Sequence, residues 1–327
     1  MSSTSASRVV FALCVFASSV TLVGTACVGS DAPALVVSPD GATSEMSNGP
    51  DAGADELPPV GGPGTGGDGG GTDSAADVDA AGPWTPSQIK GLVLWLDGDT
   101  ATADVNGRVA TWSDKSGLHN DGTTAVDAQK PVLLTGASGL NTHQALHFDG
   151  AATFMTIAEK ASLKWTQSFV IEAVFRRIEA SGAPIFWKST GYVGVLMSMG
   201  TVNATPSVRF PQVSLNVSGG GVYSEYSASS NAVFPEGVPH RVRAAFDSSS
   251  ATLSLQLDKL APLSTLVAPP GVGAYDAPGI DVLIGKQQVT NRYLKADIGE
   301  IVAVAGATID PADILMLQSY LDAKYGL

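Results

Sequence analysis

Apolar and polar residues alternate along the chain from residue 84 onward, in short stretches separated by Gly, Pro, Asn, Asp and Ser clusters. The clearest case is a hairpin, in which the alternating stretches 238–247 and 252–258 flank a turn of three serines at 248–250. A period of two gives each strand one face toward a core. No helical segments alternate with the strands, which disfavours a parallel βαβ architecture. The pattern therefore predicts an all-β domain over residues 84–327.

The same pattern places further strands along this domain and a helix at its end. The strands are expected at residues 91–96, 108–112, 145–148, 169–175, 184–187, 193–199, 213–217, 280–284 and 298–304. In the last stretch, Asp310 supplies an N-cap and Pro311 suits a first helical turn. Ile314, Leu317 and Leu321 then recur at helical spacing. We expect this short helix to pack against an edge of the sandwich, where it would cover exposed strand backbone.

The segment before the domain lacks this pattern. Residues 28–83 hold ten Asp or Glu, no Lys or Arg, and a background of Gly, Pro, Ser and Ala. Such a stretch cannot bury a core, so residues 27–83 are expected to form a disordered acidic linker. Its acids carry most of the formal net charge of −13, which leaves the domain only mildly acidic. Because Lys and Arg are not clustered, nucleic acid is not expected as a partner.

The first 26 residues have the outline of a signal peptide, in which Arg8 precedes an apolar run that ends in small residues. A transmembrane span is an alternative that the interspersed Ser and Thr disfavour. Residues 22–27 (LVGTAC) resemble a bacterial lipoprotein signal. The resemblance implies a lipid anchor at Cys27 and, since Val28 follows rather than Asp, an outer-membrane or cell-surface location. Ordinary cleavage near Ala26, with secretion, is the alternative.

Several motifs, taken in order, resemble a known group of domains. They are GLVLWLD at 91–97, TWSDKSGLHN at 111–120, LHFDG at 146–150, IGEI at 298–301 and the helix end at 320–327. Over these motifs the chain is similar to the laminin G-like branch of the concanavalin A-like lectin and glucanase superfamily. The resemblance implies a jelly-roll sandwich of two antiparallel sheets, which often binds glycans or proteins and often holds calcium near a rim. The same scaffold also hosts glycosidases, so the fold does not fix the function.

The sequence lacks the carboxylates that the glucanase relatives use. Those relatives would place a nucleophile and an acid on one strand face as Glu-x-Asp-x-x-Glu, about 5.5 Å apart. The nearest approach is Asp297 and Glu300, whose spacing predicts opposite faces of an extended strand, one acid at a rim and the other solvated. No zinc-binding His motif, nucleophile elbow or phosphate loop occurs. We therefore expect a protein that is not an enzyme, with a polysaccharide hydrolase and a structural envelope protein as alternatives.

Two sets of residues are candidates for binding. Calcium takes oxygen ligands from loops, and the candidate ligands near the first two strands are Asp97, Asp99, Asp114 and Asn120. An alternative is that Asp114 and Asn120 stabilise a turn through local hydrogen bonds. The candidate aromatic residues for holding a sugar are Trp187, Tyr192, Tyr223 and Tyr226, although aromatic side chains are often core. The expected function is recognition of an extracellular glycan or surface protein, without turnover and with no cofactor other than calcium.

Overall fold

The computed structural model describes residues 82–179, 183–189, 194–198, 212–219, 222–229, 235–266, 279–288 and 291–327. The expected signal peptide, Cys27 and the expected linker up to residue 81 lie outside the described residues. No helix in the described ranges is long and apolar enough to cross a membrane.

The first sheet has eight strands and contains the long strand β18 (Lys295–Gly306). Its order is β14 (Leu263–Leu266), β13 (Thr252–Leu257), β12 (Pro239–Asp247), β7 (Ser168–Arg177), β18, β5 (Ala145–Asp149) and β4 (Val132–Leu134). β5 pairs with the start of β18, and β1 (Leu92–Asp97) pairs with the rest of that same edge. All of these pairings are antiparallel, as the sequence predicts.

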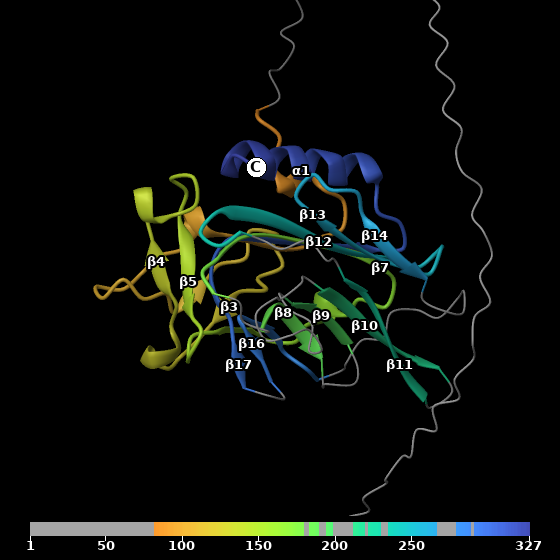
Figure 1. Cartoon of the computed structure of the whole chain (residues 1–327), viewed down its shortest axis with the longest axis horizontal. Helices are drawn as coiled ribbons and strands as arrows, with labels where there is room; N and C mark the ends of the chain where they lie inside the picture. Colours follow the sequence, from red (N-terminus) through yellow and green to blue (C-terminus); the bar gives the residue numbers. More distant parts are fainter. Residues whose placement is uncertain are drawn as a thin grey trace, which may run out of the picture. The chain divides into compact units, whose positions relative to one another are not determined.

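The second sheet also has eight strands and lies beneath the first (Figure 1). Its order is β11 (Val222–Ser229), β10 (Gln212–Gly219), β9 (Gly194–Ser198), β8 (Pro184–Ser189), β15 (Val282–Ile284), β6 (Met155–Ile157), β3 (Gly122–Thr123) and β2 (Thr111–Trp112). A separate ribbon joins β16 (Lys286–Gln287) and β17 (Arg292–Tyr293). Short 3-10 turns occupy Pro86–Gln88, Gly98–Thr100, Asp127–Gln129, Gly136–Ser138 and Ala161–Leu163. The described chain is thus an antiparallel β-sandwich, which confirms the predicted fold class.

The core between the sheets follows from the alternation in the sequence. On β12 and β13 every second residue is buried in the core, as Val242, Phe246 and Leu255 illustrate. Trp165 stacks on Phe186, with ring centroids 5.3 Å apart. Burying one such large apolar side chain contributes about 1.5–3 kcal/mol, so the many alternating positions together hold the two sheets against each other.

The single α-helix of the described part, α1 (Pro311–Tyr325), covers the outer face of the first sheet (Figure 1). Leu317 and Leu321 pack in one apolar cluster with Val174 of β7 and Val302 of β18. These are inner strands of the sheet, so the expectation that the helix covers a sandwich edge is wrong. The reason is that β7 and β18 also carry apolar residues on their outer face, such as Val174 and Val302, and these residues require a cover of their own.

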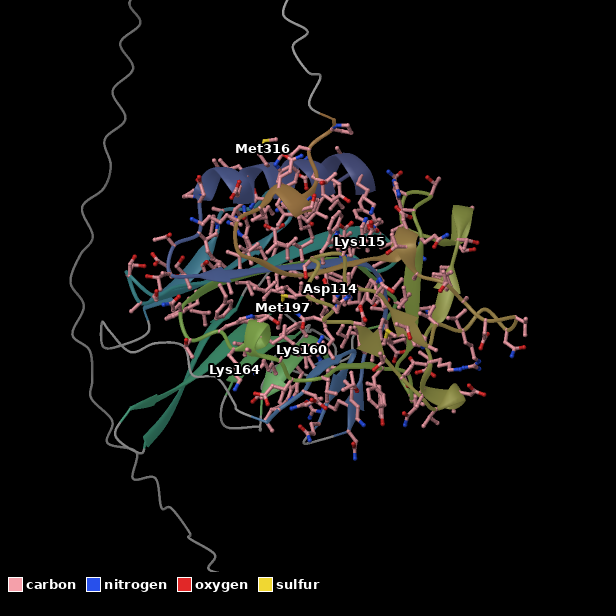
Figure 2. All side chains as sticks on the ribbon, turned by 180° about the vertical axis from the view of Figure 1, so that it is seen from behind. Asp114, Lys115, Lys160, Lys164, Met197 and Met316 are labelled. Atoms are coloured by element: carbon pink, nitrogen blue, oxygen red, sulfur yellow. The ribbon has the colours of Figure 1, made fainter. Side chains whose placement is uncertain are left out.

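The ends of α1 are fixed by Asp310 and Pro311, which the sequence singled out, and by Gly326. The Asp310 side chain accepts a hydrogen bond from the Ala312 N–H at 2.8 Å, and Pro311 occupies the first turn. Gly326 ends the helix with a φ of +68°, a left-handed conformation that glycine adopts without steric cost. Met316 lies on the solvent side of the helix (Figure 2).

Candidate functional site

The two acids nearest to a catalytic pair, Asp297 and Glu300, are both buried, at 1% and 0% exposure. The register of β18 against β7 shifts between Ile298 and Glu300. This bulge at Gly299 turns Asp297 and Glu300 to the same outer face, while Ile298 points into the core between the sheets. The expectation of opposite faces, with one acid solvated, is therefore wrong, because a bulge adds a residue that a regular period of two does not count.

Glu300 belongs to a buried group of charges under the last turn of α1. It accepts hydrogen bonds from Trp95 Nε1 at 2.6 Å, Lys324 Nζ at 2.9 Å and the Tyr325 hydroxyl at 3.1 Å. Burial raises the pKa of Glu300 above its usual range, and the charge of Lys324 opposes that shift. Burial alone would lower the pKa of Lys324, but Glu300 and Asp97 outweigh it and hold that pKa above its ordinary value. We call Asp97, Glu300 and Lys324 the buried ion cluster.

Asp297 is held separately from this cluster. One of its oxygens accepts from Arg176 Nε at 2.8 Å and Nη2 at 2.6 Å, and the other lies 2.7 Å from His147 Nδ1. Arg176 also donates to the carbonyl oxygens of Ser138 and Gly139. Both acids thus have partners within the fold.

The proposed calcium ligands also have protein partners. Asp97 binds Lys115 Nζ at 2.9 Å and Lys324 Nζ at 2.7 Å. Asp99 accepts a hydrogen bond from the Gln144 N–H and contacts His143. Burial would raise the pKa of Asp99, but Gln144, His143 and Lys324 together hold this pKa below its usual value. The described residues contain no group of three or more His, Cys, Asp or Glu placed to hold a metal ion. Calcium binding therefore stays a prediction.

Asp114 and Asn120 are joined by the local bonds that the alternative interpretation expected. Asp114 accepts from the backbone N–H groups of Trp95, Ser116 and Asn120, at 2.8 to 2.9 Å. The Asn120 side chain donates to the Val93 carbonyl at 2.7 Å. Asp114 forms an isolated antiparallel β-bridge with Leu96 of β1. These contacts tie the turn that follows Asp114 to β1.

Of the four aromatic candidates, Trp187 is the one whose side chain the structure describes. Trp187 lies in β8 with 3% of its surface exposed, and its Nε1 donates to the Ser189 carbonyl at 2.8 Å. Its ring therefore has little surface to offer a sugar, contrary to the expected platform. Tyr192 lies outside the described residues, and Tyr223 and Tyr226 belong to β11, whose backbone alone is described.

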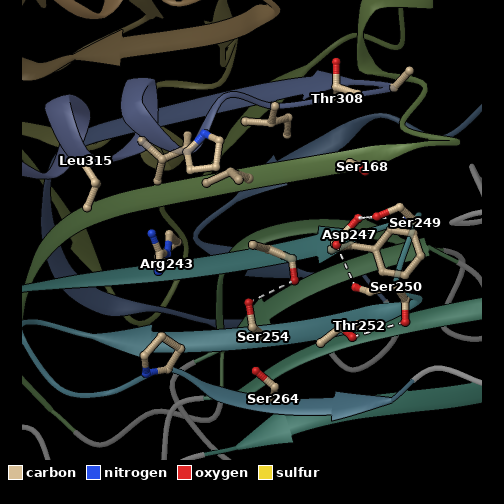
Figure 3. Close-up of a pocket in the computed structure, with 18 residues that line it drawn as sticks. Ser168, Arg243, Asp247, Ser249, Ser250, Thr252, Ser254, Ser264, Thr308 and Leu315 are labelled. Atoms are coloured by element: carbon tan, nitrogen blue, oxygen red, sulfur yellow. Dashed lines mark hydrogen bonds between the residues drawn. The ribbon is translucent and has the colours of Figure 1, made fainter.

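A groove of about 680 Å³ lies on the outer face of the first sheet, beside the start of α1 (Figure 3). Its polar lining is rich in hydroxyl groups, which come from Ser168, Ser249, Ser250, Thr252, Ser254, Ser264 and Thr308. Its apolar lining includes Val170, Ala245, Ile309 and Leu315. We call this recess the hydroxyl groove. Its mixture of hydroxyl groups and small apolar surface is suited to a polar ligand with apolar faces.

One cation and one acid line the hydroxyl groove, and both come from β12. Asp247 accepts from the Ser249 N–H and hydroxyl and from the Ser250 hydroxyl, at 2.7 to 2.9 Å. The Ser250 and Ser249 hydroxyls lower the pKa of Asp247 below its usual value. Arg243 lies near Leu315, toward the other end of the groove (Figure 3). Burial lowers the pKa of Arg243, and Glu172 counteracts that shift.

A second recess, of about 590 Å³, lies beside α1 and includes Lys324 of the buried ion cluster in its lining. Trp84, Tyr320, His143 and Lys324 line it, and the Trp84 and Tyr320 ring centroids are 6.1 Å apart. Burial raises the pKa of Tyr320 above its usual value.

Sequence reasoning missed the hydroxyl groove. A signal was present, because Arg243, Thr252 and Ser254 are outward positions of the predicted hairpin. The groove also needs residues 307–315 and Ser168, which only the tertiary fold brings beside that hairpin.

No protein-family model matches the chain. A search of curated proteins finds no match either. Solved structures do match in fold. The binding domain of Paraclostridial Mosquitocidal Protein 1 is 9% identical, with a TM-score of 0.53, over 73% of this chain and 54% of that one. Domain 4 of AbnA, a GH43 extracellular arabinanase from Geobacillus stearothermophilus solved with arabinotriose, is 12% identical, with a TM-score of 0.48, over 71% of this chain and 100% of that one.

The botulinum neurotoxin serotype C1 binding domain is 13% identical, with a TM-score of 0.46, over 72% of this chain and 53% of that one. The chain thus spans about half the length of the two toxin domains. At such identities the likeness concerns the fold alone. Fold and comparison together define the class: the described chain is an antiparallel β-sandwich with a short C-terminal helix, similar in fold to a toxin binding domain.

Proposed function

We propose that the chain is a surface-anchored recognition module that binds a glycan in the hydroxyl groove and does not cleave it. The observation that carries this proposal is the lining of the groove, which includes seven residues with hydroxyl groups and a single acid that is bonded within its own turn. Serine and threonine hydroxyls donate and accept hydrogen bonds, as sugar hydroxyls do. A hydrolase would need two carboxyl groups on either side of the scissile bond, and one acid does not meet that need.

The likeness to the laminin G-like branch supports the same proposal, since that group often binds glycans or proteins. We further propose that the module is exported and held at the outer membrane or cell surface by a lipid on Cys27. The acidic stretch at 28–83 would then be a spacer with a root-mean-square span of roughly 40 Å. Such a spacer would hold the binding groove away from the membrane.

Binding of the purified full-length chain to a printed glycan array, with and without calcium, tests the proposal. Ala245→Trp would place a large ring on the floor of the groove, and the matched control Ala128→Trp adds the same ring at an exposed residue outside it. We expect binding by the native chain and by the control, and its loss in Ala245→Trp. Absence of binding to any glycan, or equal binding by both variants, would contradict the proposal. Exclusive capture of surface proteins would assign the module a protein ligand instead.

A further inference from the structure

Arg243 and its neighbour Arg241 lie on the same outer face of β12 but differ in their partners. Arg241 Nη1 donates to Glu172 Oε2 at 3.2 Å, Nη2 donates to the Asp258 carbonyl at 2.9 Å, and Nε lies 3.1 Å from Asp322. Arg241 is therefore held by partners within the fold. Arg243 is half-buried and, among the described residues, makes no hydrogen bond or ion pair. Its guanidinium keeps its five N–H donors available.

The acids near Arg243 do not use these donors. Glu172 lies opposite Arg243 in the β7 and β12 register and attracts it electrostatically, but its hydrogen-bonded cation is Arg241. Asp247 is four residues further along β12, which places it about 13 Å away along an extended strand. Its carboxylate is also occupied by Ser249 and Ser250. The groove therefore presents a cation that lacks a hydrogen-bonded anion.

Desolvation makes this cation selective. A guanidinium that is half removed from water has lost part of its hydration, and a bidentate carboxylate is the partner that best replaces it. The surrounding hydroxyl groups and the apolar strip of Ala245 and Leu315 suit the hydroxyls and the C–H face of a sugar ring. Because the guanidinium and the hydroxyl groups lie in one groove, the groove suits a single ligand that carries both a carboxylate and a sugar ring.

We propose that the hydroxyl groove binds acidic saccharides, such as uronic-acid or sialic-acid glycans, through an ion pair between the sugar carboxylate and Arg243. This inference rests on the proposed glycan-binding function and names its ligand class. The sugar ring lies along the serine and threonine hydroxyls, and its carboxylate takes the end of the groove near Leu315.

The test compares acidic glycans with their carboxyl-reduced counterparts, in which each carboxylate is replaced by a primary alcohol. Binding of pectin, alginate and sialylated oligosaccharides to the full-length chain is measured by titration calorimetry beside these reduced forms and a neutral set. Arg243→Gln removes the charge from the groove, and Arg243→Lys keeps the charge without the planar fork. The control is Arg292→Gln, which removes an exposed arginine from the β16 and β17 ribbon, outside the groove.

We expect at least one acidic glycan to bind, with at least about tenfold weaker affinity after carboxyl reduction or in Arg243→Gln. Arg292→Gln should bind as the native chain does, and Arg243→Lys should fall between the two. Binding of neutral glycans that Arg243→Gln leaves intact would overturn this inference while sparing the proposed function. Absence of binding to every glycan would overturn both. Binding of acidic glycans that survives carboxyl reduction would also overturn the inference.

Discussion

Lys324 Nζ lies 2.9 Å from Glu300 Oε2, an ion pair that ties the last turn of α1 to the middle of β18. Both side chains are almost fully withdrawn from water, and Asp97 completes the cluster at 2.7 Å from the same ammonium. Two buried carboxylates thus depend on one lysine, which also lies 3.2 Å from the more exposed Asp99. Lys115 is a further partner of Asp97. The charge of Lys324 therefore has a structural role, and its removal would leave an uncompensated buried acid.

Lys324→Met should destabilise the fold by about 3–5 kcal/mol at neutral pH, the usual cost of breaking a buried pair on one side. Urea unfolding of the full-length chain, followed by tryptophan fluorescence, measures it. Lys90→Met is the control, because Lys90 is exposed and should change the free energy of unfolding by no more than about 0.5 kcal/mol. A loss below about 1 kcal/mol in Lys324→Met would contradict the assigned role.

Gly299→Ala should also destabilise the fold, by about 1–3 kcal/mol, because the added methyl group overpacks the site. A Cβ at this position would lie 2.9 Å from Tyr325 Cε1 and 3.0 Å from Leu140 Cδ1. Gly122→Ala is the matched strand control, since its Cβ would meet its nearest neighbours at an ordinary 3.6 Å. The two free energies of unfolding from urea titration decide this prediction. Equal values would show that the bulge leaves room for a side chain.

Asp149 should make the fold sensitive to acid. Burial would raise its pKa, but the N–H groups of Ala152, Ala151 and Thr153 lower the pKa to about 2. Because the folded pKa lies below the unfolded value of 3.8, the charged carboxylate stabilises the fold above pH 4. That contribution is lost as the pH falls toward 2.

For this half-buried group the contribution, discounted for solvent screening, is about 1 kcal/mol. Asp149→Asn should therefore be less stable than the native chain at pH 7, and the gap should narrow between pH 4 and pH 2. Unfolding titrations at several pH values measure this gap. A gap that is constant with pH would mean that the charge of Asp149 does not contribute.

Cys27→Ser should release the protein from membranes if Cys27 carries the lipid. Metabolic labelling with a tritiated fatty acid, followed by membrane fractionation, measures both the lipid and the location. Cys14→Ser is the control, because Cys14 lies within the expected signal peptide, and its replacement should leave labelling unchanged. A Cys27→Ser chain that is still labelled and membrane-bound would point to a different anchor.

Local patterns in the sequence predicted those parts of the fold that depend on local residues. The hairpin of β12 and β13 and the helix α1 were predicted because the alternation, the cap at Asp310 and the helical spacing after it act within a few residues. The bulge at Gly299 was not predicted, since it arises where β18 pairs with β1, β5 and β7 at once. The position of α1 was missed for a related reason, because the second apolar face of the sheet forms only when strands distant in sequence pair.

The hydroxyl groove could not be predicted from the sequence for the same reason. Its residues come from β7, the hairpin of β12 and β13, β14 and the start of α1, so no single motif contains it. Composition does indicate polar outward positions on the hairpin. It does not indicate that Arg243 lies in a recess without a hydrogen-bonded acid, because that depends on Arg241 being the residue that pairs with Glu172.

The central claim is that the chain holds a saccharide without transforming it. The most direct measurement incubates the full-length chain with an end-labelled acidic oligosaccharide that it binds, recovers the ligand, and determines its length by size-exclusion chromatography. We predict saturable binding and complete recovery of the label at its starting length after prolonged incubation. Labelled products of shorter length that accumulate in proportion to protein concentration would contradict the claim and identify a hydrolase.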